Sequence, residues 1–120
     1  MPAKTPEECD RLFEERINAG DLDGLVALYE PDATFVPQAG DTVHGTAAIR
    51  GALGEFVAMK PKLRMNVTRV IAIGKDLAMI YNDWTMTAGG QTGTGKAIEL
   101  MRRQADGTWR FALDAPFGRD

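Results

Sequence analysis

Apolar side chains recur every three or four residues at the start of the chain, which predicts helices. Thr5 precedes Pro6, and Glu8 follows three residues later, as in a capping box with proline at the first helical position. This helix is predicted to end near "NAGD". Asp21 is positioned to cap a second, shorter helix that "EPD" ends. The apolar faces of the two helices comprise Cys9, Leu12, Phe13 and Ile17, and Leu22, Leu25, Val26 and Tyr29, respectively.

The middle of the chain changes from strand-like to helical patterning. The segments "ATFVPQAG" and "DTVHG" predict two short strands joined by a glycine-containing turn. Thr46 is positioned to cap a third helix, "AAIRGALGEFVAM", which Lys60-Pro61 closes. One side of this helix carries Ile49, Leu53, Phe56 and Val57.

From Leu63 onward the hydrophobic period becomes two, which is typical of strands. Turn sequences at 74–76, 89–90 and 105–107 separate four predicted strands, at roughly 63–73, 77–87, 92–104 and 108–115. Short turns between long strands imply antiparallel neighbours, because a parallel return needs a crossover of a dozen residues or more. The pattern therefore predicts an α+β fold with helices over one face of a curved sheet.

The stretch "GGQTGTGKA" contains G-x-x-x-x-G-K, the pattern of a phosphate-binding loop. That loop requires a hydroxyl side chain after the lysine and a helix that opens there, whereas this chain has Ala97. The following "KAIELMRRQ" is too short for a crossover helix. The glycines are therefore interpreted as a hairpin turn and as strand positions where other groups approach closely.

Composition narrows the function classes. A chain of 120 residues is predicted to form one domain, residues 1–120, and its net charge of −3 provides no basic surface for nucleic acid. The sequence shows neither a signal peptide nor an apolar run long enough to span a bilayer, so no membrane partner and a cytoplasmic location are predicted. One cysteine and one histidine make a zinc site improbable, and no metal or cofactor is predicted.

The segment "AGDLDGLVALYEPDATFVPQAGDTVHGTAAIRGAL" resembles the front half of the nuclear transport factor 2-like, or SnoaL-like, superfamily. The resemblance implies a cone-shaped, cystatin-like roll, in which three helices pack on a curved, mainly antiparallel sheet around a pocket. "YNDWTMT", "ELMRRQADGTW" and "RFALDAPFG" resemble the YybH and SgcJ-like group of small bacterial proteins. The fold hosts isomerases, dehydratases, epoxide hydrolases, cyclases and oligomerisation modules, so the resemblance names no reaction.

Catalytic positions of the ketosteroid isomerase branch can be compared with this chain. Where that branch has a phenol on the first helix this chain has Phe13, and where it has the proton-abstracting carboxylate this chain has Pro37. Its second, protonated acid corresponds to Glu99. Because two of three groups are missing, steroid isomerisation by that mechanism is not expected.

Strand alternation, with the inward face implied by the resemblance, predicts the lining of the pocket. Glu99 and Asp114 are the predicted acid/base groups, because burial raises the pKa of a carboxyl group toward the range of a general acid or base. The predicted ligand contacts are Phe13, Asn82, Trp84, Met86, Met101 and Ala112. As an alternative, both acids pair with backbone amides or with Arg102, Arg103 or Arg110. His44 is interpreted as a structural hydrogen-bonding residue, and Arg50 as a partner of a surface acid.

Three functions are consistent with these patterns. The chain is a cofactor-free acid/base enzyme of isomerase, cyclase or hydrolase type acting on a small apolar or aromatic compound, a non-catalytic ligand-binding domain, or an assembly module. A homodimer through the outer sheet face is also predicted, because a large exposed apolar patch is unusual in a monomer. The residues predicted to form this outer patch are Met79, Tyr81, Trp109, Phe111 and Leu113.

Overall fold

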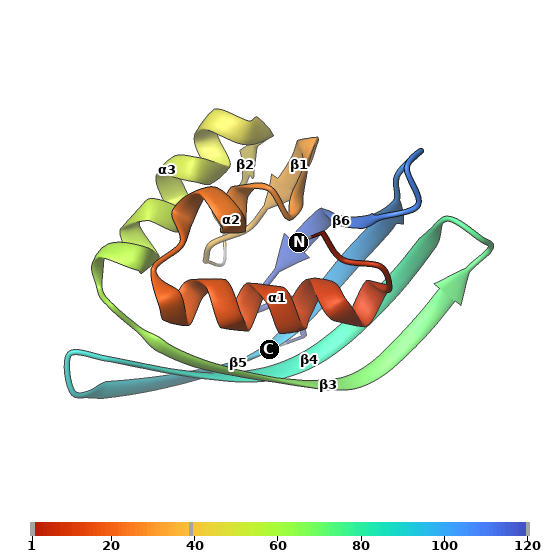
Figure 1. The fold of residues 1–120 in the computed structure, drawn as a ribbon. Helices are drawn as coiled ribbons and strands as arrows, with labels where there is room; N and C mark the ends of the chain where they lie inside the picture. Colours follow the sequence, from red (N-terminus) through yellow and green to blue (C-terminus); the bar gives the residue numbers. More distant parts are fainter. Residues whose placement is uncertain (1, 39, 120) are drawn as a thin grey trace.

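Three helices cover one face of a curved six-stranded sheet, which confirms the predicted α+β architecture (Figure 1). The computed structural model describes residues 2–38 and 40–119. Within these residues, no helix is both long and apolar enough to cross a membrane. The helices are α1 (Pro6–Ala19), α2 (Leu22–Val26) and α3 (Gly45–Ala58), and the strands are β1 (Tyr29–Phe35), β2 (Val43–His44), β3 (Lys62–Ile73), β4 (Leu77–Ala88), β5 (Gln91–Arg103) and β6 (Trp109–Ala115).

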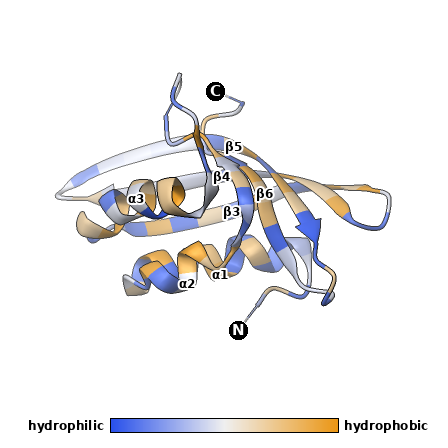
Figure 2. Ribbon diagram, turned by 90° about the horizontal axis from the view of Figure 1, so that it is seen from above, coloured by the Kyte–Doolittle hydropathy of each residue, from blue (hydrophilic) through white to orange (hydrophobic). Residues whose placement is uncertain are grey.

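The sheet has the strand order β2-β1-β6-β5-β4-β3, in which only β1 and β6 run parallel. The long strands β3 to β6 form an antiparallel meander, as their short turns predict. Hydrophobic and hydrophilic residues alternate along these strands (Figure 2). The helices lie against the concave side, so inward-pointing residues are covered and outward-pointing ones form the outer face of the sheet.

Two of the three predicted helix caps are confirmed. The Thr5 hydroxyl accepts a hydrogen bond from the Glu8 backbone N–H at 3.2 Å, and Asp21 accepts one from the Gly24 N–H at 2.9 Å. The predicted cap of the third helix is wrong, because α3 already begins at Gly45 and has no side-chain cap. Gly45 adopts a φ of 84°, and this left-handed conformation lets the chain turn directly from β2 into the helix.

Tyr29 does not belong to the second helix, which ends at Val26. It is instead the first residue of β1 and lies beside Phe111 of β6 in the parallel pair. The ladder is irregular between Tyr29 and Thr34, so Pro31 can lie within this strand without interrupting a regular hydrogen-bond ladder. Pairing with Phe111, which is far away in the sequence, therefore determined the conformation of Tyr29, although the local spacing of apolar residues predicted a helix.

The "GGQTGTGK" stretch is a hairpin followed by a strand, as predicted. Gly89 and Gly90 form the turn with φ values of 58° and 80°, and β5 begins at Gln91. The lysine of the motif therefore lies within a strand and does not open a helix.

A bulge in β6 changes which of its side chains point inward. Leu113 lies opposite Leu100, but Phe111 lies opposite Met101, so Ala112 is an extra residue on β6. Phe111, predicted on the outer face, is consequently fully buried on the helix side and stacks on Tyr29 with ring centroids 4.8 Å apart. Trp109 also packs against the core. The half-buried apolar residues of the outer face are instead Met79, Tyr81, Ile98, Leu100 and Leu113.

Candidate functional site

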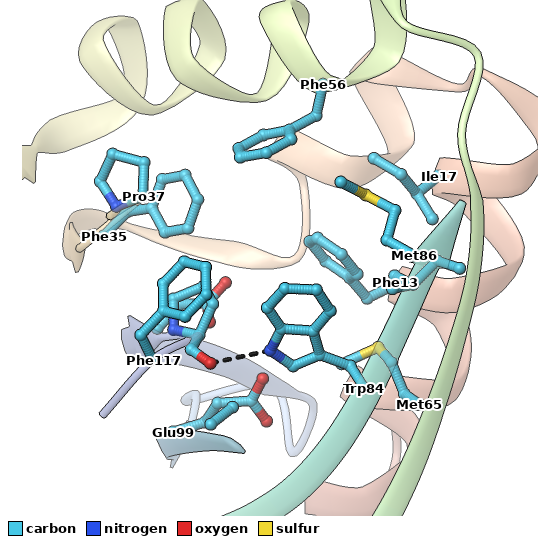
Figure 3. Close-up of a pocket in the computed structure, with 14 residues that line it drawn as sticks. Phe13, Ile17, Phe35, Pro37, Phe56, Met65, Trp84, Met86, Glu99 and Phe117 are labelled. Carbon is cyan, nitrogen blue, oxygen red and sulfur yellow. Dashed lines mark hydrogen bonds between the residues drawn. The ribbon is translucent and has the colours of Figure 1, made fainter. Parts of the chain in front are cut away.

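A cavity of about 130 Å³ lies between the concave side of the sheet and the helices α1 and α3. Its wall is almost entirely carbon, and Figure 3 shows Phe56 at one end and Glu99 at the other. Two carboxyl groups, those of Glu99 and Asp114, are its only ionisable side chains among the described residues. The wall is formed by Phe13, Ile17, Phe35, Pro37, Phe56, Leu63, Met65, Trp84, Met86, Ala97, Glu99, Asp114, Pro116 and Phe117.

Trp84 forms a flat wall of this cavity because Gly95 lies directly beneath its ring. A Cβ atom on Gly95 would lie 2.3 Å from an indole carbon, closer than any side chain can approach. The indole N–H donates a hydrogen bond to the Pro116 carbonyl at 2.7 Å (Figure 3). Phe117 meets the same indole edge-on at 5.3 Å between centroids. The glycine of the apparent phosphate motif therefore serves the cavity wall, by the close approach that the sequence predicted.

Glu99 and Asp114 lie directly opposite each other on β5 and β6. They are only 2% and 4% exposed. The Tyr29 hydroxyl donates a hydrogen bond of 2.5 Å to Asp114 Oδ2. Tyr29 comes from β1, and its role in the site was not predicted from the sequence.

Neither acid forms an ion pair with an arginine within the described part of the chain. Arg102 pairs with Glu30, Arg103 pairs with Asp76, and the remaining ion pairs of residues 2–38 and 40–119 also use surface acids. The alternative that Glu99 and Asp114 pair with Arg102, Arg103 or Arg110 is therefore wrong for the described residues. Backbone amides do not account for the two acids either, since no hydrogen bond from such a group shifts the pKa of either carboxyl.

A third buried acid, Asp10 of α1, completes the cluster. It is 1% exposed, accepts a hydrogen bond from the Asn82 amide at 3.2 Å, and shares a hydrogen bond with the Glu99 carboxyl group. The sequence analysis missed it, although a signal was present. Asp10 lies three residues before Phe13 and seven before Ile17, so this acid occupies the apolar face of the helix.

Burial dominates the electrostatics of the cluster. It raises the pKa of Asp10 to about 6 and that of Asp114 to about 7, although hydrogen bonds from their neighbours oppose the shift. The pKa of Glu99 is raised well above its ordinary value, first by burial and then by the negative charge of Asp10. Both directions agree with a proton that Glu99 holds and donates in its hydrogen bond to Asp10. Burial, followed by the charge of Asp114, raises the pKa of Tyr29 as well.

The structure places five of the predicted site residues in the cavity wall and three outside it. Phe13, Trp84, Met86, Glu99 and Asp114 line the cavity. Asn82 points inward but lies behind the wall, where it is bonded to Asp10. Met101 is buried in the core. Ala112 is displaced by the bulge in β6.

Two other interpretations from the sequence are confirmed. His44 Nδ1 lies 3.0 Å from the Thr34 hydroxyl, in a hydrogen bond that links β2 to β1. Arg50 of α3 forms an ion pair of 2.8 Å with Asp23 at the surface. Neither side chain lines the cavity.

The three positions compared with ketosteroid isomerases meet in the cavity. Phe13, Pro37 and Glu99 all line it, although they come from α1, the segment after β1, and β5. The three positions thus share one cavity, and of the three only Glu99 carries an ionisable group. The phenol of this cluster comes instead from Tyr29.

Comparison with known proteins agrees with this architecture. Among solved structures, the chain is similar to a candidate calcium/calmodulin-dependent protein kinase type II association domain from Thiobacillus denitrificans, with 22% identity, a TM-score of 0.81, and coverage of 96% of this chain and 95% of the other. An NTF2-like protein of unknown function from Shewanella oneidensis has 19% identity, a TM-score of 0.80, and coverage of 90% and 92%. A ketosteroid isomerase-like protein from Erwinia carotovora atroseptica has 17% identity, a TM-score of 0.73, and coverage of 90% and 88%.

These likenesses are too distant in sequence to carry more than the fold. The family model of the SnoaL-like domain, in contrast, matches residues 10–112, a span that includes both Asp10 and Glu99. The chain therefore belongs to the SnoaL-like domain family.

Proposed function

We propose that the cavity binds one small, largely apolar molecule. The observation that carries this proposal is a carbon-lined cavity ending at two buried carboxyl groups that pair with no cationic side chain of residues 2–38 and 40–119. Its volume of about 130 Å³ is close to the cavity of roughly 150 Å³ that admits benzene in another protein. The size therefore favours a molecule built on a single six-membered ring.

Glu99 and Asp114 are the proposed acid/base groups of a cofactor-free reaction. Glu99 can transfer to an oxygen of the bound molecule the proton that it otherwise shares with Asp10, and Asp114, with a pKa of about 7, can take a proton from a neighbouring carbon and return it. The electron pair of the broken C–H bond moves into a C=C bond while the oxygen gains the proton. These proton transfers are those of an isomerase that acts next to a carbonyl group.

Binding is tested with toluene, cyclohexanol and cyclohexanone by NMR titration. Ala97 lines the cavity, whereas Ala78, equally buried at 1% exposure, does not. Ala97→Val is expected to weaken binding of all three compounds severalfold, and the matched control Ala78→Val to leave it unchanged. Absence of binding by every compound would contradict the proposal.

Turnover is tested by following cyclohexanone in D2O by NMR. If Asp114 and Glu99 exchange protons with the ring, deuterium enters next to the carbonyl group faster than in buffer. Glu99→Gln and Asp114→Asn should each abolish this acceleration, while Glu55→Gln, an exposed acid of α3, should keep it. Binding without accelerated exchange would favour the non-catalytic ligand-binding domain.

A second proposed role is assembly through the outer sheet face. Its apolar residues Met79, Tyr81, Ile98, Leu100 and Leu113 remain half-buried in the single chain, and two structural neighbours are named as candidate association domains. We expect a homodimer with this face buried. Leu100→Asp should shift sedimentation to the monomer, and a wild-type monomer at high micromolar concentration would refute the proposal.

Residues 1–120 are proposed to act as one domain of the YybH and SgcJ-like group. The sequence motifs that support this narrower placement are "YNDWTMT" on β4 and "RFALDAPFG", which covers most of β6 and the three residues after it. The first contains Asn82 and Trp84, and the second contains Asp114 and Phe117, so the motifs coincide with the cavity and the acid cluster.

A further inference from the structure

We propose that the molecule bound in this cavity carries a protonated amine on a small apolar body, with Asp114 as the anionic partner, Glu99 Oε1 as a hydrogen-bond acceptor and the surrounding aromatic rings as the rest of the cation site. This inference rests on the proposed binding function and names the chemical class of the ligand.

The first step concerns the missing positive charge. Asp10, Glu99 and Asp114 are all at least 96% buried, and no ion pair of the described residues includes them. Glu99 borders the cavity, and its Oε1 has no hydrogen-bond donor. Buried carboxylates are normally paired with a cation or neutralised. A ligand cation would supply the partner that the described part of the chain does not.

The second step concerns hydrogen-bond donors. Three neutral side chains near the acids can donate, and each already has an acceptor. The Trp84 N–H bonds to the Pro116 carbonyl, the Tyr29 hydroxyl to Asp114, and the Asn82 amide to Asp10. Glu99 donates its own proton to Asp10. The described side chains at this end of the cavity therefore present acceptors, and these match a ligand that brings N–H donors.

The third step concerns the aromatic rings. Phe13, Phe35, Phe56, Trp84 and Phe117 line the same cavity as the two acids (Figure 3). Ring faces attract cations within about 6 Å of the ring centre, and the attraction is stronger where water is excluded. The same rings would also bury the apolar part of the ligand. A metal ion fits less well, because no three His, Cys, Asp or Glu side chains within residues 2–38 and 40–119 are placed to hold one.

The charge of the site gives the binding a characteristic pH dependence. The ionisable groups of the cluster are Asp10 of α1, Tyr29 of β1, Glu99 of β5 and Asp114 of β6, and Cys9 lies next to Asp10 in sequence with a raised pKa. From β3, β4 and α3 only neutral side chains line the cavity. Asp10 and Asp114 become ionised as the pH rises through about 6 and about 7, respectively. A cation should therefore bind more tightly at higher pH.

The test compares cyclohexylamine, cyclohexanol and cyclohexanecarboxylate by NMR titration of the full chain. We expect the amine to bind at least about tenfold more tightly than the alcohol at pH 8, and its affinity to fall by about tenfold or more at pH 5.5. The carboxylate should not bind. Asp114→Asn should remove most of the amine preference, while Glu55→Gln, the same chemical change at the surface, should preserve it.

The outcomes separate this inference from the proposed function. If the alcohol binds as tightly as the amine, or if amine affinity does not rise with pH in the unsubstituted protein, the amine inference is wrong and the binding function stands. If none of the ring compounds binds, the binding function itself fails and the inference fails with it. The pH series needs no variant, so a misfolded Asp114→Asn protein would not leave the question open.

Discussion

At two neighbouring pairs of positions, on β5 and β6, the inner and outer faces of the sheet reverse the usual distribution of polarity. On β5, Glu99 points inward and is 2% exposed, whereas its neighbour Leu100 points outward and is only half-buried. On β6, Asp114 is inside and Leu113 is outside. A sheet with one face in water normally places its apolar residues inside and its polar residues outside. The proposed ligand would explain the acids of the inner face, and the proposed homodimer would cover the apolar outer face.

The two faces also differ in how strongly the protein depends on them. Inner side chains pack against the helices and against one another, so changing their size or charge alters close contacts. Outer side chains are less enclosed, and the contact that the C-terminal segment makes with them is that of the Arg119 guanidinium, 4.7 Å from the centre of the Tyr81 ring. Substitutions on the inner face should therefore change the free energy of unfolding more than substitutions on the outer face.

The largest expected effect follows from the bulge in β6. Phe111→Ala should lower the free energy of unfolding by about 3–5 kcal/mol, because it removes a fully buried ring stacked on Tyr29. Leu113→Ala, on the outer face, should cost about 1 kcal/mol in the monomer. Urea unfolding measures both values. The opposite ranking would mean that β6 alternates regularly and that Phe111 faces outward.

The second effect is a fall in stability as the pH rises from about 4 to about 7. The pKa values of Asp10 and Asp114 are raised from 3.8 to about 6 and about 7, so the folded chain binds protons more tightly than the unfolded chain. The stabilisation is complete below 3.8 and is lost as the pH rises through the raised pKa values. The change should be on the order of a few kcal/mol.

Asp114→Asn should flatten the upper part of this pH window, and Asp10→Asn the lower part. Chemical unfolding at several pH values measures both profiles. A wild-type stability that rises across the window would show that the acids are stabilised as anions, and it would remove the contrast between the inner face and an ordinary core.

The third prediction concerns the cavity wall. Gly95→Ala should lower the free energy of unfolding by about 1–3 kcal/mol, because the new Cβ would overlap the Trp84 indole. Gly93 lies on the same strand, and a Cβ there would meet nothing within 4 Å, so Gly93→Ala is the matched control. Thermal or urea unfolding of the pair distinguishes a clash from a general strand effect. Equal changes in both variants would show that Trp84 moves aside freely.

The smallest change in the free energy of unfolding is expected when an exposed ion pair is removed, because water screens its charges. Asp23 pairs with Arg50 at the surface, where its side chain is 86% exposed. Arg50→Ala should change the free energy of unfolding by less than about 1 kcal/mol. The same measurement in high salt should reduce even that difference. A larger loss would show that this pair does more than join the surfaces of α2 and α3.

The sequence by itself determined those features that depend on neighbouring residues. The capping groups of Thr5 and Asp21, the glycine turn at 89–90 and the period-two strands were all predicted, because each follows from backbone conformation and local spacing. Alternation combined with the family resemblance also predicted that Trp84 and Glu99 point into the cavity. The sequence also predicted that another group approaches a strand glycine closely, but it did not predict that the glycine is Gly95 and the group is the Trp84 indole.

Only the tertiary structure decided which distant groups meet. Asp10 and Tyr29 joined the acid cluster because α1 crosses the sheet and β1 pairs in parallel with β6, and neither pairing leaves a local periodic signal. One extra residue at Ala112 reversed the predicted direction of Phe111. Periodicity specifies the faces of an element, but register and strand order determine what each face touches, because they arise from contacts between segments far apart in the chain.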